Sequence, residues 1–281
     1  MKKKIAWVTD STTYLDDELK NHPDMYSIPL TIILDDKEYN DGIDLTPQEL
    51  YSRLKTLKSP PKTSQPSVGA FKILYEKLAE NYDMVIAVLL SSKLSGTVSS
   101  SEQAAQLVNI PVITIDSKII AYMQTYLIKY GMNAARQEDN IESVIKKMEE
   151  ITDTNETYVL IGSLEQLHRS GRMNGLQFIL GSMLNVKPII SIENGVLEAK
   201  EKVRSEKKAR EKIVNLLKSS HEKNTIKEAY ILYGLQPEAA LQWKNELSEQ
   251  FPEIDFGVYP LCATIGVHAG ENTLGISWYN S

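Results

Sequence analysis

The sequence is poor in cysteine and has no long apolar run. Its single cysteine, Cys262, excludes an intrachain disulfide and fits a reducing compartment. No stretch approaches the roughly 18 apolar residues that a membrane-spanning helix needs. The apolar segment after the N-terminal lysines, Ile5–Val8, is shorter than the roughly 7–15 apolar residues of a secretory signal. We therefore expect a soluble, cytoplasmic protein without a membrane anchor.

Motifs for metals and nucleotides are also missing. The four histidines are scattered without the spacing of metal ligands, and there is no pair of cysteines. Neither G-x-x-x-x-G-K-[ST] nor G-x-G-x-x-G is present, so the sequence does not indicate a bound nucleotide. The formal net charge of −6 argues against sequence-independent binding of nucleic acid, which needs a basic surface. We expect no metal, no cofactor and no nucleic-acid partner.

The composition that is present is typical of a globular protein, with 281 residues of which 42% are hydrophobic. Apolar runs alternate with helical patterns in the first half, which predicts an α/β fold with a mostly parallel sheet and helices on both faces. In the second half, Asn194-Gly195 between Val186–Ile192 and Val196–Val203 indicates a hairpin and predicts a mixed or antiparallel sheet. A polar linker at 152–156 separates one α/β domain at residues 1–155 from another at residues 156–281.

Several local patterns make specific predictions. Tyr26–Leu34 has the composition of one strand, and the proline-rich Ser59–Ser67 has that of a surface loop. Thr46-Pro-Gln-Glu49 is a capping box with proline at the first helical position. Leu176–Leu184 is apolar at nearly every position, which is typical of a segment buried on all sides. The glycines of Gly266–Gly270 favour a loop whose backbone approaches another segment closely.

The stretch that begins at Val85 is a candidate binding site. Val85–Leu90 is typical of a buried strand, and Ser91–Thr97 follows it as a loop of hydroxyl groups with one glycine. N–H groups at the start of the next helix attract anions, while Ser95 adds a donor and Gly96 allows close approach. The same residues also suit an ordinary helix cap, so both interpretations stay open.

A serine hydrolase is an alternative interpretation of the same stretch. Polar residues also follow the neighbouring strands, and the carboxyl ends of parallel strands share one edge of a sheet. Ser95 would be the nucleophile and His268 the base, with Asp10 or Asp116 as the orienting acid. The nucleophile elbow G-x-S-x-G is absent, however. A cluster of equivalent hydroxyl groups suits holding an anion better than activating one nucleophile.

A set of motifs runs through nearly the whole chain. In order, they are Val8-Thr-Asp-Ser-Thr12, Asn40-Asp-Gly-Ile-Asp44, Thr63-Ser-Gln-Pro-Ser67, Leu90-Ser-Ser-Lys-Leu-Ser-Gly-Thr97, Ile115-Asp-Ser-Lys118, Gly171-Arg172, Leu184-Asn-Val-Lys-Pro188, Lys202-Val-Arg204, His268-Ala-Gly270 and Thr273-Leu-Gly275. In these motifs the chain resembles the DegV family of bacterial fatty-acid-binding proteins, the binding subunits of fatty acid kinases. It departs from the usual pattern at Gln124, Ser170 and Glu271-Asn272, which affects loop shape and partner fit.

The resemblance implies a two-domain α/β fold with a long-chain fatty acid in a buried tunnel between the domains. The carboxylate would be held by Thr63, Ser95, Gly96, Arg204 and His268. Without the resemblance, Arg204 also fits a solvated charge on a polar face, and His268 also fits a loop histidine whose hydrogen bonds are satisfied within the protein. The energetics agree with such a site, because an acyl chain gains about 0.8 kcal/mol per buried methylene. A carboxylate buried without partners would cancel much of that gain.

The resemblance also implies an acyl carrier that is not an enzyme by itself. It would present the acid to an ATP-dependent fatty acid kinase, which makes the acyl phosphate for phospholipid metabolism. Arg169 and Arg172 would contact this partner, and a transient contact with a membrane surface is compatible with the role. Leu176–Leu184 and Ile189–Ile192 are candidates for tunnel wall or for plain core. A third possibility is an interaction protein whose cleft stays empty.

Overall fold

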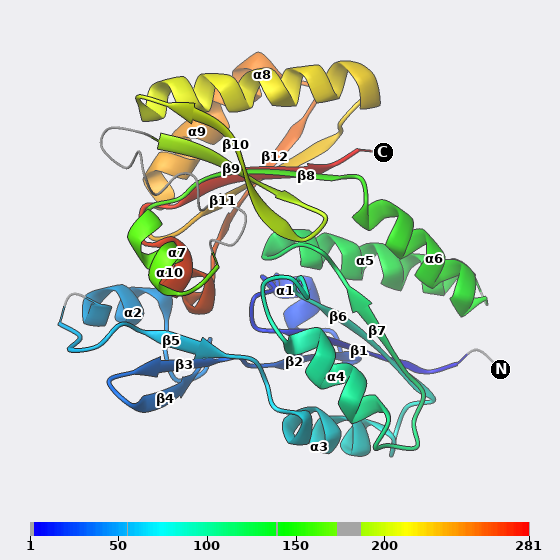
Figure 1. Cartoon of the computed structure of the whole chain (residues 1–281). Coiled ribbons are helices and arrows are strands. Elements are labelled where there is room, and N and C mark those ends of the chain that lie inside the picture. The colour runs from blue at the N-terminus through cyan, green and yellow to red at the C-terminus, as the bar shows by residue number, and fades with distance from the viewer. Residues whose placement is uncertain (1–2, 55, 139, 173–186, 281) are drawn as a thin grey trace.

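The computed structural model describes residues 3–54, 56–138, 140–172 and 187–280, which form an α/β fold (Figure 1). Its strands are β1 (Ile5–Asp10), β2 (Met25–Ile28), β3 (Thr31–Leu34), β4 (Lys37–Asn40), β5 (Lys62–Ser64), β6 (Met84–Leu89), β7 (Val112–Asp116), β8 (Asn155–Leu160), β9 (Lys187–Glu193), β10 (Val196–Val203), β11 (Glu228–Tyr233), β12 (Asp255–Pro260) and β13 (Leu274–Tyr279). Its helices are α1 (Asp17–Lys20), α2 (Pro47–Leu54), α3 (Val68–Leu78), α4 (Thr97–Ala105), α5 (Tyr122–Gln137), α6 (Ile141–Thr152), α7 (Leu164–Arg169), α8 (Glu206–Asn224), α9 (Pro237–Gln250) and α10 (Ala263–Ala269).

The first sheet consists of four parallel strands in the order β2-β1-β6-β7. Every residue of β6 is buried, and successive side chains of a strand point to opposite faces of the sheet. Val85, Ala87 and Leu89 share a hydrophobic cluster with α3 and α4. Ile86 and Val88 share another cluster with α5 and α6. The predicted parallel sheet with helices on both faces is therefore confirmed.

The second sheet has six strands in the order β10-β9-β8-β13-β11-β12, all antiparallel to their neighbours except the parallel pair β11 and β12. Helices α8 and α9 cover one of its faces (Figure 1). Asn194 and Gly195 both have positive φ and join β9 to β10, which confirms the predicted hairpin. All six strands lie at or after Asn155. The domain boundary between residues 155 and 156 stays a prediction.

Two predictions about the first half are wrong. Tyr26–Leu34 forms not one strand but two, because β2 pairs with β1 and β3 pairs with β4 and β5 in a small antiparallel sheet. Pro29 lies between β2 and β3 and has no N–H with which to continue a ladder. Ser59–Ser67 is not only a loop, because β5 lies within it and places Thr63 opposite Ile32 of β3.

Other local predictions have mixed outcomes. The capping box is confirmed, since Thr46 N donates to Glu49 Oε2 at 2.8 Å and Thr46 Oγ1 accepts from Glu49 N at 3.2 Å. The expected loop around Gly266 is wrong, because this segment is the helix α10, but the expected close approach is confirmed: a Cβ at Gly266 would lie 2.5 Å from Tyr51 Oη. The expected linker at 152–156 is only a short turn between α6 and β8. Leu176–Leu184 lies outside the described residues.

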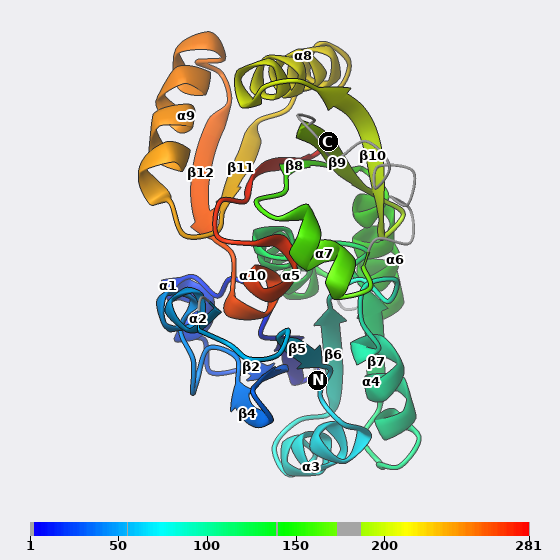
Figure 2. The same cartoon turned by 60° about the vertical axis from the view of Figure 1, so that its left-hand side comes forward.

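The carboxyl ends of the parallel strands point toward the second sheet, as the arrow of β6 shows (Figure 2). At this edge the Asp10 carboxylate accepts hydrogen bonds from Leu90 N at 2.7 Å and Thr12 N at 2.9 Å. Ser92 N donates to Asp116 Oδ1 at 3.1 Å. The loops after β1, β6 and β7 therefore share one edge, as predicted. The chain places β2 on one side of β1 and β6 on the other, so the strand order reverses next to β1. In open α/β sheets, ligands bind beyond the carboxyl ends of the strands at such a point.

Gly131 in α5 lets α5 pack closely on α6 and β1. A Cβ there would lie 2.5 Å from Met148 Sδ and 2.8 Å from Trp7 Cη2. We expect Gly131→Ala to lower the free energy of unfolding by about 1–3 kcal/mol through overpacking. The control Gly69→Ala in α3, where the added Cβ meets only Ser67 Oγ at 3.8 Å, should be neutral or stabilise by up to about 1 kcal/mol. Urea unfolding measures both, and equal effects would contradict this packing.

Candidate functional site

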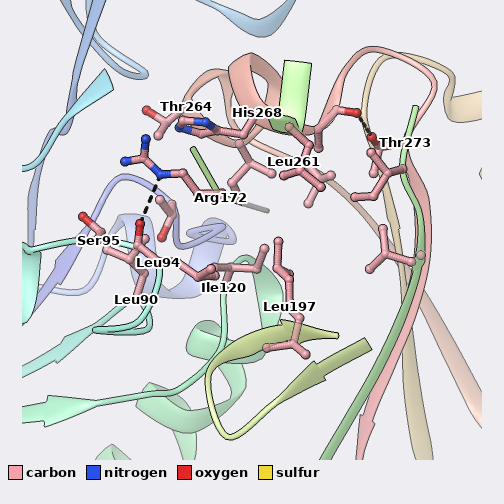
Figure 3. A pocket seen from close by; sticks show the side chains of 18 of the residues that line it. Leu90, Leu94, Ser95, Ile120, Arg172, Leu197, Leu261, Thr264, His268 and Thr273 are labelled. Atoms are coloured by element: carbon pink, nitrogen blue, oxygen red, sulfur yellow. Dashed lines mark hydrogen bonds between the residues drawn. The ribbon is translucent and has the colours of Figure 1, made fainter. Parts of the chain in front are cut away.

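A cavity lies between the carboxyl edge of the parallel sheet and the six-stranded sheet (Figure 3). The empty space between its walls, including the open mouth, is about 930 Å³. Its walls are mainly leucine, isoleucine and valine side chains from β8 to β11, from the loop after β6 and from the segment before α5. The two halves of the chain thus contribute to one mostly apolar space.

Polar side chains gather at one end of this cavity (Figure 3). Thr63 comes from β5, Ser95 from the loop after β6, Arg172 from the segment after α7, and Thr264 and His268 from α10. His268 Nε2 and Thr63 Oγ1 are 2.8 Å apart, and Ser95 Oγ lies 2.9 Å from Thr97 Oγ1. Segments distant in the sequence therefore place hydroxyl, imidazole and guanidinium groups together.

His268 is an uncharged hydrogen-bonding group in this setting. Burial, with a smaller contribution from the Arg172 charge, lowers the pKa of His268 to about 3. The imidazole is therefore neutral at physiological pH, and Thr63 is its partner at Nε2. Nδ1 is buried and has no hydrogen-bond partner among the described residues.

Arg172 is a half-buried cation that lines the polar end. Its guanidinium donates to two carbonyl oxygens, Ser170 O at 2.6 Å from Nη1 and Leu94 O at 3.5 Å from Nε. Burial lowers the pKa of Arg172, and no carboxylate in the described part of the chain offsets this effect. Removing a charge from water is costly unless an opposite charge or hydrogen bonds replace the water. The polar end therefore favours an anion.

The far side of the cavity contains hydroxyl groups of a different kind. Thr273 Oγ1 donates to the carbonyl oxygen of Ala269 at 2.8 Å, and Thr157 Oγ1 donates to Asn155 Oδ1 at 2.8 Å. These hydroxyl groups are satisfied within the protein, so their side chains require no polar ligand atom. The two sides of the cavity thus suit a ligand with one charged end and a hydrocarbon body.

Three of the predicted site residues, Thr63, Ser95 and His268, meet at the polar end of the cavity. Gly96 lies beside them as the N-cap residue of α4, where no side chain caps the helix, and the Ser95 hydroxyl pairs with Thr97 Oγ1. A Cβ at Gly96 would lie 2.9 Å from Gln65 Nε2. The side-chain cap that the sequence allowed at the start of α4 is therefore not formed. The absence of a side chain at Gly96 lets the segment after β5 approach.

The structure does not bring Arg204 to the cavity. Its side chain is exposed just after β10 and lies outside the lining set. The arginine at the cavity is Arg172, which was predicted to contact a partner protein, while Arg169 is exposed and pairs with Glu165 at 2.6 Å. The sequence analysis also missed Thr264, which lines the cavity one helical turn before His268. That spacing becomes informative only once the segment is known to be helical.

The residues of the alternative hydrolase do not form a triad. His268 Nε2 contacts Thr63, and no described aspartate contacts Nδ1. Asp10 accepts from Leu90 and Thr12, as given above, while Asp116 Oδ1 also accepts from Lys118 N at 3.0 Å.

Over the described residues, no cluster of three or more histidine, cysteine or acidic side chains is arranged to hold a metal. In the same ranges, no helix combines the length and hydropathy required to cross a bilayer.

Comparison with solved structures finds similar proteins over nearly the whole chain. Among solved structures, a fatty-acid-binding DegV family protein from Thermus thermophilus matches with a TM-score of 0.92 and 30% identity, over 99% of this chain and 100% of that one. DegV from Bacillus subtilis, described as a fatty acid binding protein, matches with a TM-score of 0.90 and 34% identity, also over 99% and 100%. The Streptococcus pneumoniae Fatty Acid Kinase (Fak) B3 protein, loaded with linoleic acid, shares the fold with a TM-score of 0.84 at 18% identity, over 99% and 100%.

The model of the family described as an uncharacterised protein of the DegV family matches residues 4–281. This match covers nearly the whole chain, including both sheets and the cavity between them. The chain belongs to the DegV family.

Proposed function

We propose that the protein binds a long-chain fatty acid in this cavity, with the carboxylate at the polar end and the acyl chain among the aliphatic side chains. The observation that carries the proposal is Arg172, a half-buried cation at the end of an apolar cavity with no carboxylate partner among the described residues. Two relatives of at least 30% identity, the proteins from T. thermophilus and B. subtilis, are described as binding fatty acids, which supports the proposal.

The polar end has the donors that a carboxylate needs. Arg172 supplies a positive charge, and charge-assisted hydrogen bonds are the stronger ones. Thr63 can donate its hydroxyl proton to the ligand when His268 carries its own proton on Nε2 and donates to Thr63. A bound carboxylate therefore favours this tautomer of His268, which leaves an acceptor rather than a donor unpartnered at Nδ1. Ser95 and the N–H groups at the start of α4 complete the set.

The same proposal makes the protein a carrier in the cytoplasm that presents the acid to an ATP-dependent fatty acid kinase. The exposed Arg169 is the residue we assign to the partner contact. Arg172 replaces Arg204 in the carboxylate site of this proposal. The hydrolase alternative has less support, because the His268 imidazole pairs with Thr63 and not with Ser95.

Replacing each arginine separately tests the carboxylate site. We expect Arg172→Met to weaken binding of a fluorescent long-chain fatty acid by about 10- to 100-fold, since a hydrogen bond to a charged group contributes about 1.5–3 kcal/mol. The matched variant Arg204→Ala should bind within about twofold of the unaltered protein, because the Arg204 side chain lies outside the cavity. Fluorescence titration measures both. A loss of affinity in Arg204→Ala alone would contradict the assignment.

Ser95 distinguishes a carrier from a hydrolase. Ser95→Ala should weaken fatty acid binding by about 3- to 10-fold, because one neutral hydrogen bond contributes about 0.5–1.5 kcal/mol. Hydrolysis of p-nitrophenyl esters should be at background in the unaltered protein and in the variant. An esterase rate that disappears in Ser95→Ala would support the hydrolase instead.

The low pKa of His268, about 3, makes stability depend on pH in a defined direction. Below its ordinary value of 6.5 the unfolded chain takes up a proton that the folded protein does not, so acid destabilises the fold. From about pH 6.5 to about pH 4.5 the ligand-free protein should lose about 2 kcal/mol more than His268→Gln. Urea unfolding at several pH values measures this loss. An identical pH dependence in both proteins would show that His268 is not buried in its neutral form.

A further inference from the structure

We propose that Gly275 determines how long an acyl chain the cavity accepts. This inference rests on the proposed function, and it concerns the side of the cavity away from the carboxylate. Gly275 lines the cavity from β13, in the middle of the six-stranded sheet. Neither the carboxylate site nor the hydrogen bonds described above require a glycine at this position.

The strand register places Gly275 in a row of cavity-lining residues. Val159 of β8 pairs with Ile190 of β9 on one side and with Gly275 on the other, and Gly275 pairs with Leu232 of β11. All four residues line the cavity. Residues paired in this way point to the same face of a sheet, with Cβ atoms about 4.5–5.5 Å apart. The row thus has three aliphatic side chains and one gap, which lies at Gly275.

A side chain at position 275 would point into the cavity. The neighbours Leu274 and Ile276 point to the opposite face, where they belong to the hydrophobic cluster under α8 and α9. A Cβ at Gly275 would lie 3.0 Å from Val159 Cγ2 and 3.1 Å from Tyr158 O. A methyl group would therefore press on Val159 Cγ2 and on the backbone at Tyr158 O, and a larger side chain would extend from there into the space beside Val159 and Leu232.

The gap lies on the side of the cavity that faces the hydrocarbon end of the ligand. Figure 3 shows Thr273 across the cavity from Ser95 and Arg172. Thr273 immediately precedes β13, and Gly275 is the second residue of that strand. The Thr273 hydroxyl is satisfied by Ala269 O, so this side has no group that would hold a carboxylate. A side chain at 275 should therefore shorten the space for the end of the acyl chain without touching the head-group contacts.

The test compares the affinities of saturated fatty acids of about 10 to 18 carbons for the unaltered protein, Gly275→Ala and Gly275→Val. Each methylene that no longer fits should reduce affinity about fourfold. We expect Gly275→Val to bind an acid of about 18 carbons at least about tenfold more weakly and an acid of about 10 carbons within about threefold. Gly275→Ala should shift the profile in the same direction by less. An equal loss at every length, or no loss, would overturn the proposal.

Two further variants keep the test independent of folding. Ile276→Val changes the same strand on the opposite face and should leave the length profile unchanged. Val159→Ala should restore part of the binding of long acids to Gly275→Val, because it removes the Val159 methyl group that the new side chain meets, while the contact with Tyr158 O remains. If Gly275→Val fails to fold, Gly275→Ala with and without Val159→Ala gives the same comparison, and no recovery would contradict the proposed gap. If the unaltered protein binds none of the acids, the proposed function itself is wrong.

Discussion

A carboxylate cannot leave water unless other groups replace its hydration, and this constraint accounts for the arrangement of the whole cavity. Aliphatic side chains from the six-stranded sheet and from the loops at the carboxyl edge of the parallel sheet surround a space that favours hydrocarbon. Such a space can take an acid only if donors and a positive charge stand at one end. The half-buried Arg172, the pair Thr63 and His268, and Ser95 provide them.

The topology brings these groups together without long side chains having to reach across the molecule. Parallel strands end at one edge, so the loops after β1, β6 and β7 meet there, and the bonds from Leu90 and Thr12 to the buried Asp10 hold the first two loops together. The six-stranded sheet supplies the opposite wall, and α10 adds His268 at the polar end of the cavity (Figure 3). In the proposed complex, head-group binding and chain binding therefore depend on the packing of the same two sheets.

Sequence patterns predicted the elements whose signal is local. The apolar run of β6, the capping box at Thr46 and the Asn194-Gly195 hairpin each carry their own physical cause, and each was found. The wrong predictions concern segments whose secondary structure is determined by tertiary contacts. Pro29 divides one apolar run between two sheets, and the glycines around His268 favour a loop until packing against Tyr51 and α7 is known.

The arginines show the same limit at the site. Arg172 and Arg204 are both charged residues in family motifs. Neither sequence spacing nor composition shows which of the two lies at the cavity. Their difference in exposure comes from the position of the segment after α7 beside Leu94, a contact between residues far apart in the chain. Thr63 was expected at the site from the family resemblance, and the pairing of β5 with β3, which holds it there, was not.

Native mass spectrometry of the protein, as purified and again after removal of lipid and addition of a long-chain fatty acid, tests fatty acid binding most directly. A carrier should show one species heavier than the bare chain by about 250–300 Da, the mass of an acid long enough to gain substantial burial energy, and should regain it after the acid is added back. A protein that keeps the mass of the bare chain in both preparations would contradict the proposed function.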